Sequence, residues 1–247
     1  MGLDLIRKEV PELRSRWKTF LIAAFFILVI SAWIVFFWWI DKLLSYGPLM
    51  SQFLVAFIAS NLEYMAIMEA PLFRERFGEQ ALRVYLFSRV IPLYVCWIAL
   101  MLHPLLVEGD RLLPRWVSVP SGTMLMIYGF LLLRAVARCE ESLARLLIFY
   151  MFLEEETAVN PGIYFYIRHP MYAGALSISL GFALIKSNAK AISTALIVLL
   201  PALVGAKLED HELTRRSREY RRYVERTGSL FPHLRDLPDF LKFISSA

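Results

Sequence analysis

The sequence predicts an all-α, polytopic integral membrane protein with about six transmembrane helices, the last two of which form a C-terminal helical hairpin. Three observations predict this class. Hydrophobic residues make up 58% of the 247 residues, which is more than an ordinary soluble domain contains. Long apolar runs recur along the chain with few charges inside them. Lys and Arg residues gather at the ends of these runs, as they do beside membrane spans.

Four apolar stretches in the first half of the chain are each long enough to cross a bilayer. The first, residues 20–40, contains no formal charge and ends in Trp33, Trp38 and Trp39, which is typical of an aromatic belt at a membrane interface. The other predicted spans cover residues 48–68, 84–106 and 117–137. An amphipathic connector, residues 140–156, follows them and is too short in its apolar centre to cross, so it is expected at the interface or against the bundle.

The last two predicted spans, residues 171–185 and 191–206, are separated by the turn sequence Lys186-Ser187-Asn188-Ala189-Lys190. This spacing predicts an antiparallel helical hairpin. Pro201 is expected to kink the second helix. That helix is expected to continue without a break into Glu209 and Asp210, followed by a basic tail.

Charge distribution sets the predicted orientation. Of the 27 Lys and Arg residues, those on the side opposite the amino terminus are Lys42, Arg111, Arg115, Lys186 and Lys190. Because positive charge is retained on the cytosolic side, we expect a multi-pass protein of the cell membrane with both termini in the cytosol. The same clustering explains the formal net charge of +5 without nucleic-acid binding.

A polar, proline-broken segment before the hairpin carries the strongest functional signal. From Glu156 to Gly174 it reads ETAVNPGIYFYIRHPMYAG. Irregular backbone at membrane depth must line a cavity or be satisfied by protein, so the segment predicts a ligand site. Basic residues and proline also begin ordinary spans. Here, however, they occur together with spaced Gly and Tyr residues and with Glu209 and Asp210 beyond the hairpin.

These residues resemble the membrane-integral methyltransferases, which include isoprenylcysteine carboxyl methyltransferases and bacterial phospholipid methyltransferases. The family pattern is Gly-x-Tyr, Arg-His-Pro-x-Tyr-x-Gly, a helical hairpin, and a Glu-Glu-x-x-Leu helix followed by paired tyrosines. Here it reads Gly162-Ile163-Tyr164, Arg168 to Gly174, Glu209 to Leu213, and Tyr220 with Tyr223. The chain would then divide into transmembrane helices and connector (1–155), a methyltransferase-like part (156–232) and a tail (233–247).

The resemblance implies an S-adenosyl-L-methionine-dependent methyltransferase with its site at the cytosolic side and a lipophilic or membrane-delivered acceptor. Aromatic faces hold a sulfonium cation, and carboxylate and guanidinium groups pair with the ammonium and carboxylate of the cofactor. The expected catalytic residues are Arg168, His169 and Glu209. The expected cofactor-binding residues are Thr157, Ala158, Val159, Gly162, Tyr164, Arg168, His169, Pro170, Met171, Tyr172, Glu209 and Asp210.

Departures from the family pattern bear on the acceptor. Gly205 stands four residues before Glu209, where the prenylcysteine enzymes carry an arginine for their substrate, so a prenylated cysteine is disfavoured. If the acceptor must lose a proton, the base would be His169, His211 or Glu212. A solvated helix face is the favoured interpretation of the last two.

Two ionisable residues inside predicted spans form a separate signal, because such groups are costly and often functional. Glu63 and Arg89 differ in depth by roughly 4–5 Å at ~1.5 Å per residue. An intramembrane ion pair between them is therefore favoured over a role for Glu63 in binding a substrate amine, although both remain substrate-site candidates. Glu69 is expected to be a solvated or interfacial charge.

Two other functions remain open. Membrane sterol-type reductases look similar over this region and use NADPH, but they usually have an acidic residue where Ala175 stands. A non-catalytic scaffold or transporter subunit would instead use Glu63 and Arg89 as a pathway. The partners expected are the lipid bilayer and a lipophilic acceptor, with no nucleic acid and no metal. Cys96 and Cys139, the two cysteines, form neither a zinc set nor a disulfide framework.

Overall fold

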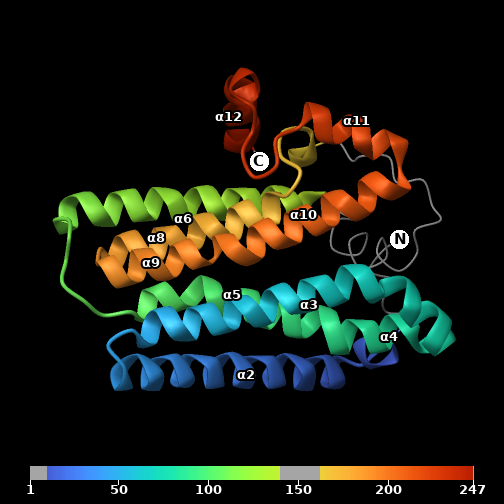
Figure 1. Ribbon diagram of the computed structural model, residues 1–247, viewed down its shortest axis with the longest axis horizontal. Helices are drawn as coiled ribbons and strands as arrows, with labels where there is room; N and C mark the ends of the chain where they lie inside the picture. The colour runs from blue at the N-terminus through green and yellow to red at the C-terminus, as the bar shows by residue number, and fades with distance from the viewer. Residues whose placement is uncertain (1–9, 140–161, 247) are drawn as a thin grey trace.

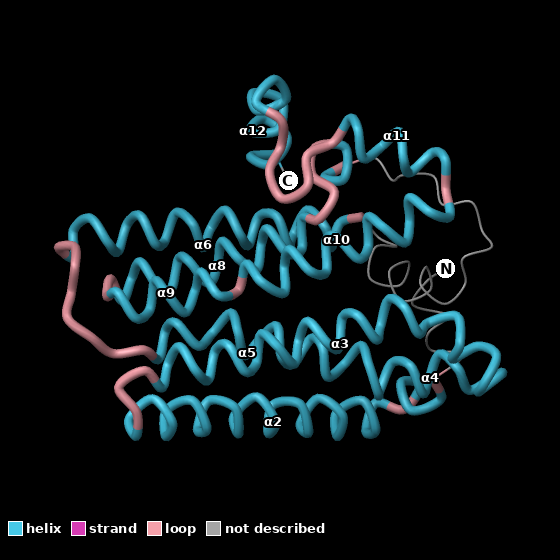
Figure 2. Tube along the Cα trace, viewed as in Figure 1, coloured by secondary structure: helices cyan, strands magenta, loops and turns pink. Residues whose placement is uncertain are grey.

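The structure, a computed structural model, describes residues 10–139 and 162–246. Its long helices run side by side in two layers (Figure 1), and within the described ranges the regular elements are all helical (Figure 2). Five helical segments in these ranges are long and apolar enough to cross a membrane, and Pro170–Lys186 is a shorter apolar helix beside them. The predicted all-α, polytopic membrane fold is therefore confirmed. The predicted connector, residues 140–156, lies outside the described residues.

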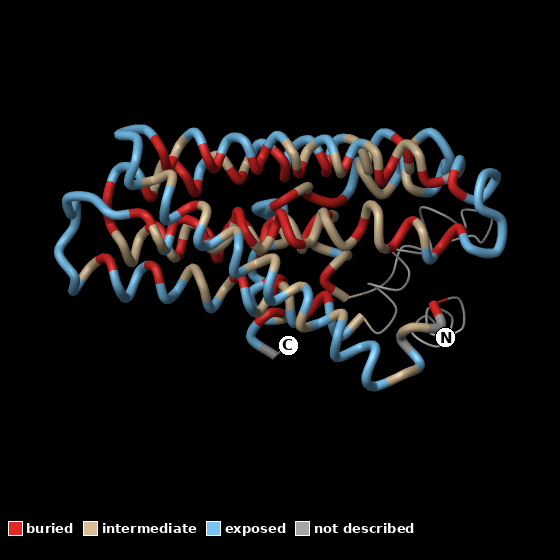
Figure 3. Tube along the Cα trace, turned by 90° about the horizontal axis from the view of Figure 1, so that it is seen from below, coloured by how far each residue is buried: buried red, intermediate tan, exposed pale blue. Residues whose placement is uncertain are grey.

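The first layer contains the amino-terminal helices. They are η1 (Pro11–Arg14), α2 (Arg16–Leu43), α3 (Gly47–Phe77), η2 (Gly78–Gln80), α4 (Ala81–Tyr85), η3 (Leu86–Val90) and α5 (Ile91–Leu106). Buried residues gather on the faces that the helices turn toward each other (Figure 3). In α2 only Phe37 is buried, and most of its apolar side chains point outward. So much exposed apolar surface is unusual on a soluble protein, and it fits a helix that faces lipid.

The second layer contains α6 (Arg115–Arg138), α8 (Pro170–Lys186), α9 (Ala189–Ile197) and α10 (Leu199–Arg216). The predicted hairpin is confirmed: α8 ends at Lys186, Ser187 adopts the left-handed conformation (φ 54°), and the Asn188 side chain accepts from Ala191 N at 2.8 Å at the start of α9. The helix is interrupted at Val198, between α9 and α10. Pro201 has no N–H for the carbonyl four residues before it, so an interruption here is expected.

Glycines hold α6 and α8 in close contact. A Cβ atom on Gly122 would lie 2.6 Å from the carbonyl oxygen of Gly181, and one on Gly129 would lie 2.7 Å from that of Gly174. Small residues allow this approach of two backbones inside a membrane. The contact fixes α8 against α6 and so positions the residues at the start of α8.

The carboxyl-terminal elements lie beyond the end of α10. They are α11 (Arg218–Arg226), η5 (Leu234–Asp236) and α12 (Leu237–Ser246), and the short helix η4 (Ile163–Phe165) precedes α8. In α12 the side chain of Phe240 is buried and packs against Tyr128 of α6 and Tyr166 after η4. The chain end therefore packs against the same end of the bundle as the Arg168-His169 segment.

Candidate functional site

The segment before α8 is held by backbone contacts with the chain that follows α11. Arg168 N donates to Gly228 O at 2.9 Å, and His169 N donates to Ser229 O at 3.0 Å. At the start of the segment Gly162 has φ +100°, a conformation that side chains rarely adopt, and a Cβ there would lie 3.2 Å from Cys139 Sγ. Gly162 thus shapes the backbone.

His169 lies between two carboxylates of α10. Its Nδ1 is 3.1 Å from Glu209 Oε2 and its Nε2 is 3.0 Å from Asp210 Oδ1. The residue is buried, at 4% exposure. Burial alone would lower the pKa of His169, but the hydrogen bonds to Asp210 and Glu209 raise it to about 9. At neutral pH the ring is therefore an imidazolium that donates to both acids.

Arg168 connects α10 to α11. Its Nε and Nη2 donate to the two oxygens of Asp210 at 3.2 and 2.9 Å. Its Nη1 donates to the backbone carbonyls of Val224, at 2.9 Å, and Thr227. Each guanidinium nitrogen thus already has a protein acceptor, and the planar, bidentate pair holds α10 and α11 in one arrangement.

The paired tyrosines of α11 face the segment as well. Tyr220 donates its hydroxyl to Asp210 Oδ1 at 2.9 Å, and Tyr223 donates to the backbone carbonyl of Tyr164 at 2.6 Å. Burial and the nearby Asp210 carboxylate raise the pKa of Tyr220, so its hydroxyl keeps its proton. Both tyrosines tie α11 to the segment around His169.

Tyr172 on the first turn of α8 meets Glu209 from α10. The Tyr172 hydroxyl donates to Glu209 Oε1 at 2.7 Å, and the Tyr172 ring stacks against Trp97 of α5 at 5.3 Å between centroids. The loop before the hairpin and the acids after it therefore come together, as the motif predicts.

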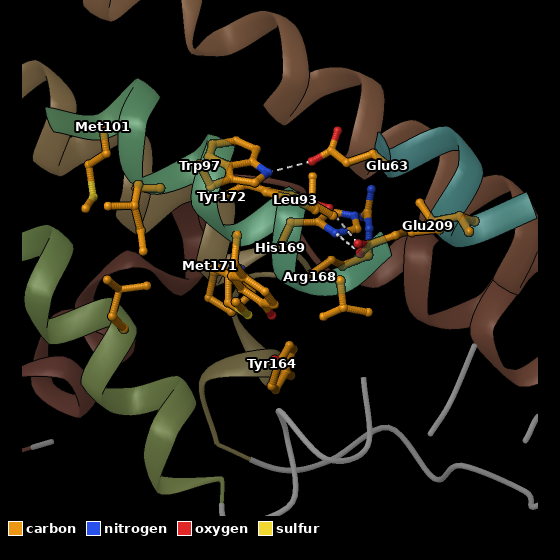
Figure 4. Close-up of a pocket in the computed structure, with 18 of the residues that line it drawn as sticks. Glu63, Leu93, Trp97, Met101, Tyr164, Arg168, His169, Met171, Tyr172 and Glu209 are labelled. Carbon is orange, nitrogen blue, oxygen red and sulfur yellow. Dashed lines mark hydrogen bonds and ion pairs between the residues drawn. The ribbon is translucent and has the colours of Figure 1, made fainter. Parts of the chain in front are cut away.

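A cavity of about 300 Å³ lies beside this contact, between the two layers of helices. Figure 4 shows Tyr164, Arg168, His169, Met171, Tyr172 and Glu209 around it, facing Glu63 of α3 and Leu93, Trp97 and Met101 of α5. The volume is at the lower end of the range for small-molecule sites. The lining is polar near Glu209 and otherwise largely apolar and aromatic.

The predicted ion pair between Glu63 and Arg89 is wrong. Arg89 Nη2 donates to Glu69 Oε2 at 2.9 Å, so Arg89 pairs with Glu69, whose side chain is 33% exposed. Glu63, which is 1% exposed, accepts from Trp97 Nε1 at 2.8 Å. Arg89 lies along α3 at the level of Glu69, whereas Glu63 lies nearly two turns deeper on that helix.

The structure places the other predicted site residues as follows. Pro170 and Glu63 join the cavity lining, whereas Gly162, Asp210 and Arg89 are not among the lining residues. Thr157, Ala158 and Val159 lie outside the described residues. Of the other two candidates for a base, His211 is exposed as expected, but Glu212 is buried and pairs with Arg216.

Sequence reasoning missed the α5 wall of the cavity. Tyr94 and Trp97, three residues apart, lie on one face of α5 and line it together with Met101. Aromatic residues at helical spacing inside an apolar span were the available signal, although that pattern usually marks ordinary core packing.

Fold and site together define a polytopic helical membrane protein with a partly open cavity between its helix layers. Residues 117–218, from α6 to the start of α11, match the sequence model of the phospholipid methyltransferase family. The resemblance predicted from the motif is thereby confirmed, and the match supports a membrane methyltransferase. No curated protein and no solved structure matches the chain.

Proposed function

We propose that this protein is an S-adenosyl-L-methionine-dependent methyltransferase that acts on a lipophilic acceptor delivered from the bilayer. One observation carries the proposal. Tyr172 and Glu209, which the hairpin separates in sequence, meet at 2.7 Å in the wall of a cavity, and both lie in the stretch that matches the phospholipid methyltransferase model. A largely apolar cavity lining limits the contact of a reacting centre with water, which strengthens electrostatic interactions there.

The polar end of the cavity fits the cofactor. Glu209 presents a carboxylate for an ammonium group or a ribose hydroxyl. Tyr164 and Tyr172 present aromatic faces suited to a sulfonium or an adenine, with Pro170 and Met171 beside them. When bound, the cofactor supplies an electrophilic methyl group on sulfur. The resemblance adds Thr157, Ala158 and Val159 to this set.

The proposed roles of the remaining residues are indirect. His169 holds Glu209 and Asp210 through its two ring nitrogens. Arg168, whose nitrogens already donate to Asp210 and to backbone carbonyls, positions α10 and α11. Gly162 and Asp210 shape the site from behind the lining residues.

The apolar end of the cavity suits a lipid-like acceptor. Leu93, Ile98 and Met101 of α5 line it together with Leu133 of α6 and Ala175 of α8. These helices belong to different layers (Figure 1), so an acceptor would enter from the bilayer between α5 and α6. The cofactor would enter from the cytosol, because the distribution of Lys and Arg favours a cytosolic position for both termini and for Glu209.

Calorimetric titration of the purified protein with S-adenosylhomocysteine and, separately, with NADPH tests the proposal. We expect binding of S-adenosylhomocysteine, loss of that binding in Glu209→Gln, and retention in Glu212→Gln, whose carboxyl group lies one helical turn away and does not line the cavity. Binding of NADPH alone would favour a sterol-type reductase. Binding of neither ligand would favour a scaffold or transporter subunit.

A further inference from the structure

The apolar stripe of α12 is wider than the part of it that the bundle covers. Its apolar residues follow the spacing of one helix face and are Leu237, Phe240, Leu241, Phe243 and Ile244. Phe240 and Ile244 are buried against the bundle, whereas Leu237 and Leu241 are 38% and 52% exposed. Leu234 of η5, just before α12, is 88% exposed. The described part of the chain therefore leaves a row of three leucines uncovered.

The other side of α12 is polar and balanced in charge. Asp239, Lys242 and Ser245 are exposed there. Arg235 and Asp236 of η5 lie 3.5 Å apart as an ion pair. The acidic and basic side chains of residues 234–246 cancel, so this segment has no net charge to attract an anionic surface. A short helix with one apolar and one polar side is typical of a membrane interface.

α12 packs against α6 at a level inside the membrane. The ring of Phe240 lies 6.3 Å from that of Tyr128, and Phe240 shares a buried cluster with Leu132 and Ala135. Tyr128 precedes Arg138, the last residue of α6, by roughly 15 Å at ~1.5 Å per residue. α6 exceeds the ~30 Å hydrocarbon core of a bilayer by only about 6 Å. The contact with α12 therefore lies below the boundary of that core.

The direction of α12 fits the same position. It runs across the long helices, beside the end of α6 from which the chain leads to the Arg168-His169 segment (Figure 1). Because the long helices cross the membrane, α12 lies roughly parallel to the membrane plane. Ile127 and Phe130 of α6, close to the Tyr128 contact in sequence, are exposed and face lipid. The uncovered leucines thus lie near the depth of a surface that the bilayer already covers.

We propose that α12 is an interfacial helix in the leaflet at the His169 end of the bundle. The leucine row, Leu234, Leu237 and Leu241, contacts the lipid acyl chains, and the polar side faces the headgroups. The partner of this face is thus the apolar boundary of the leaflet. The assignment requires neither a cofactor nor a methyl acceptor, so it goes beyond the proposed function.

The same helix holds the segment that carries the site residues. The rings of Phe240 and Phe243 lie 5.7 and 5.5 Å from the ring of Tyr166. Tyr166 lies shortly before Arg168, which donates to Asp210 of α10. α12 therefore contacts the site segment on one side and lipid on the other, and it is a positioning element between the bilayer and the site.

Spin labels on the purified protein in phosphatidylcholine nanodiscs test the position of α12. In a background without the two native cysteines, Leu241→Cys carries the label on the leucine row and Lys242→Cys carries it on the polar side. Ile127→Cys on α6 and Arg222→Cys on α11 are the lipid and water references. We expect the Leu241 label to be relaxed by oxygen and shielded from a water-soluble nickel chelate, as at Ile127. The Lys242 label should be less shielded. A Leu241 label as accessible to nickel as the Arg222 label would overturn the proposal.

Two other occupants of the leucine row give different results in the same samples. A second copy of the chain would bring two Leu241 labels together, and their spin–spin broadening would vanish on dilution with unlabelled protein. An electrostatic attachment would shield the label only when phosphatidylglycerol is added. Since the segment has no net charge, we expect equal shielding with and without that lipid. Either of the other two results would contradict docking through apolar contact.

Hydrogen exchange in nanodiscs tests whether α12 holds the site segment. Leu241→Glu places a charge in the leucine row, so α12 should leave the leaflet and the backbone amides of residues 166–169 should exchange several-fold faster. Lys242→Glu, with the same new side chain on the polar side, should leave their exchange unchanged. Exchange in α8 near Lys186 should be unaltered in both variants, which shows that the bundle remains folded. Equal exchange of residues 166–169 in Leu241→Glu and wild type would refute the positioning role.

Discussion

Two buried polar clusters lie inside this helical bundle, and they differ in how completely they are satisfied. One joins Asp41 of α2, Gln52 of α3 and His103 of α5. The other joins Tyr172, Glu209 and His169, with Glu63 of α3 accepting from Trp97 beside the same cavity. Both contain a histidine in contact with a carboxylate. Only the second borders a cavity of about 300 Å³ within the described residues.

The Asp41–His103 cluster is fully satisfied. Gln52 Nε2 donates to two backbone carbonyls, so its Oε1 must accept from His103 Nδ1, at 2.7 Å. His103 Nε2 lies 2.9 Å from Asp41 Oδ2, which leaves a proton shared between these two groups. The Ser51 hydroxyl lies 3.2 Å from the other oxygen of Asp41 and 2.9 Å from the Gly47 carbonyl oxygen. Such a complete network rigidifies a fold.

The cluster around Glu63 has the opposite property. One Glu63 oxygen and the Tyr94 hydroxyl have no hydrogen-bond partner within residues 10–139 and 162–246, the part of the chain that the structure describes. A polar group inside this bundle is therefore structural where its hydrogen bonds are complete and is a candidate for function where they are not. Mutation of the two clusters should therefore have different consequences.

The largest expected effect is in the satisfied cluster. His103→Leu leaves Asp41 and Gln52 buried without their partner, which should lower the free energy of unfolding by about 3–5 kcal/mol. Denaturant unfolding in detergent measures this loss. The folded fraction should still bind S-adenosylhomocysteine with normal affinity. Weakened binding at unchanged stability would show that the cluster is not structural.

The next effect is a dependence on pH at His169. Its pKa in the folded protein is about 9, above the ordinary 6.5, because hydrogen bonds to Asp210 and Glu209 outweigh burial. The groups that face the ring are Glu209 and Asp210 of α10, both acidic, and Tyr172 of α8. The imidazolium therefore contributes on the order of 3 kcal/mol to the free energy of unfolding. This contribution is fully present below about pH 6.5 and is lost as the pH rises through about 9.

The free energy of unfolding, measured from pH 6 to pH 10, shows whether stability falls with rising pH as expected. Wild-type protein should lose stability between pH 7 and pH 10, whereas His169→Gln should lose much less over the same interval. A wild-type profile that is flat there, or that rises, would contradict an imidazolium held between two carboxylates.

A smaller effect distinguishes a positioning role for Arg168 from direct cofactor binding. Arg168→Lys keeps the charge but loses the two parallel bonds to Asp210, which should cost about 1–2 kcal/mol. Limited proteolysis should then cut near α11 more readily. If proteolysis is unchanged while cofactor affinity falls strongly, Arg168 contacts the cofactor itself.

The smallest expected effect on stability is at Glu63. Glu63→Gln retains the volume and the acceptor for Trp97 Nε1, and the oxygen it alters has no partner among the described residues. The free energy of unfolding should change by less than about 1 kcal/mol. A loss as large as that of His103→Leu would make the Glu63 cluster structural too.

Sequence patterns predicted the helices and the meeting of Tyr172 with Glu209, because apolar length, turn residues and motif spacing are local signals. They did not predict the partner of Glu63. The depth estimate counted residues from the ends of the apolar runs, but α3 continues to Phe77, and Arg89 lies in the π-helical element η3, so Arg89 meets Glu69 and not Glu63. The Gly129–Gly174 contact and the α5 wall with Trp97 depend on tertiary packing between distant segments.

A crystal structure of the protein bound to S-adenosylhomocysteine would show where the cofactor binds. We expect the nucleoside to lie against Tyr164, Tyr172 and Glu209, with the sulfur facing the part of the cavity that contains Glu63. A ligand bound elsewhere on the bundle, with Tyr172 and Glu209 unchanged in contact and the cavity empty, would contradict it.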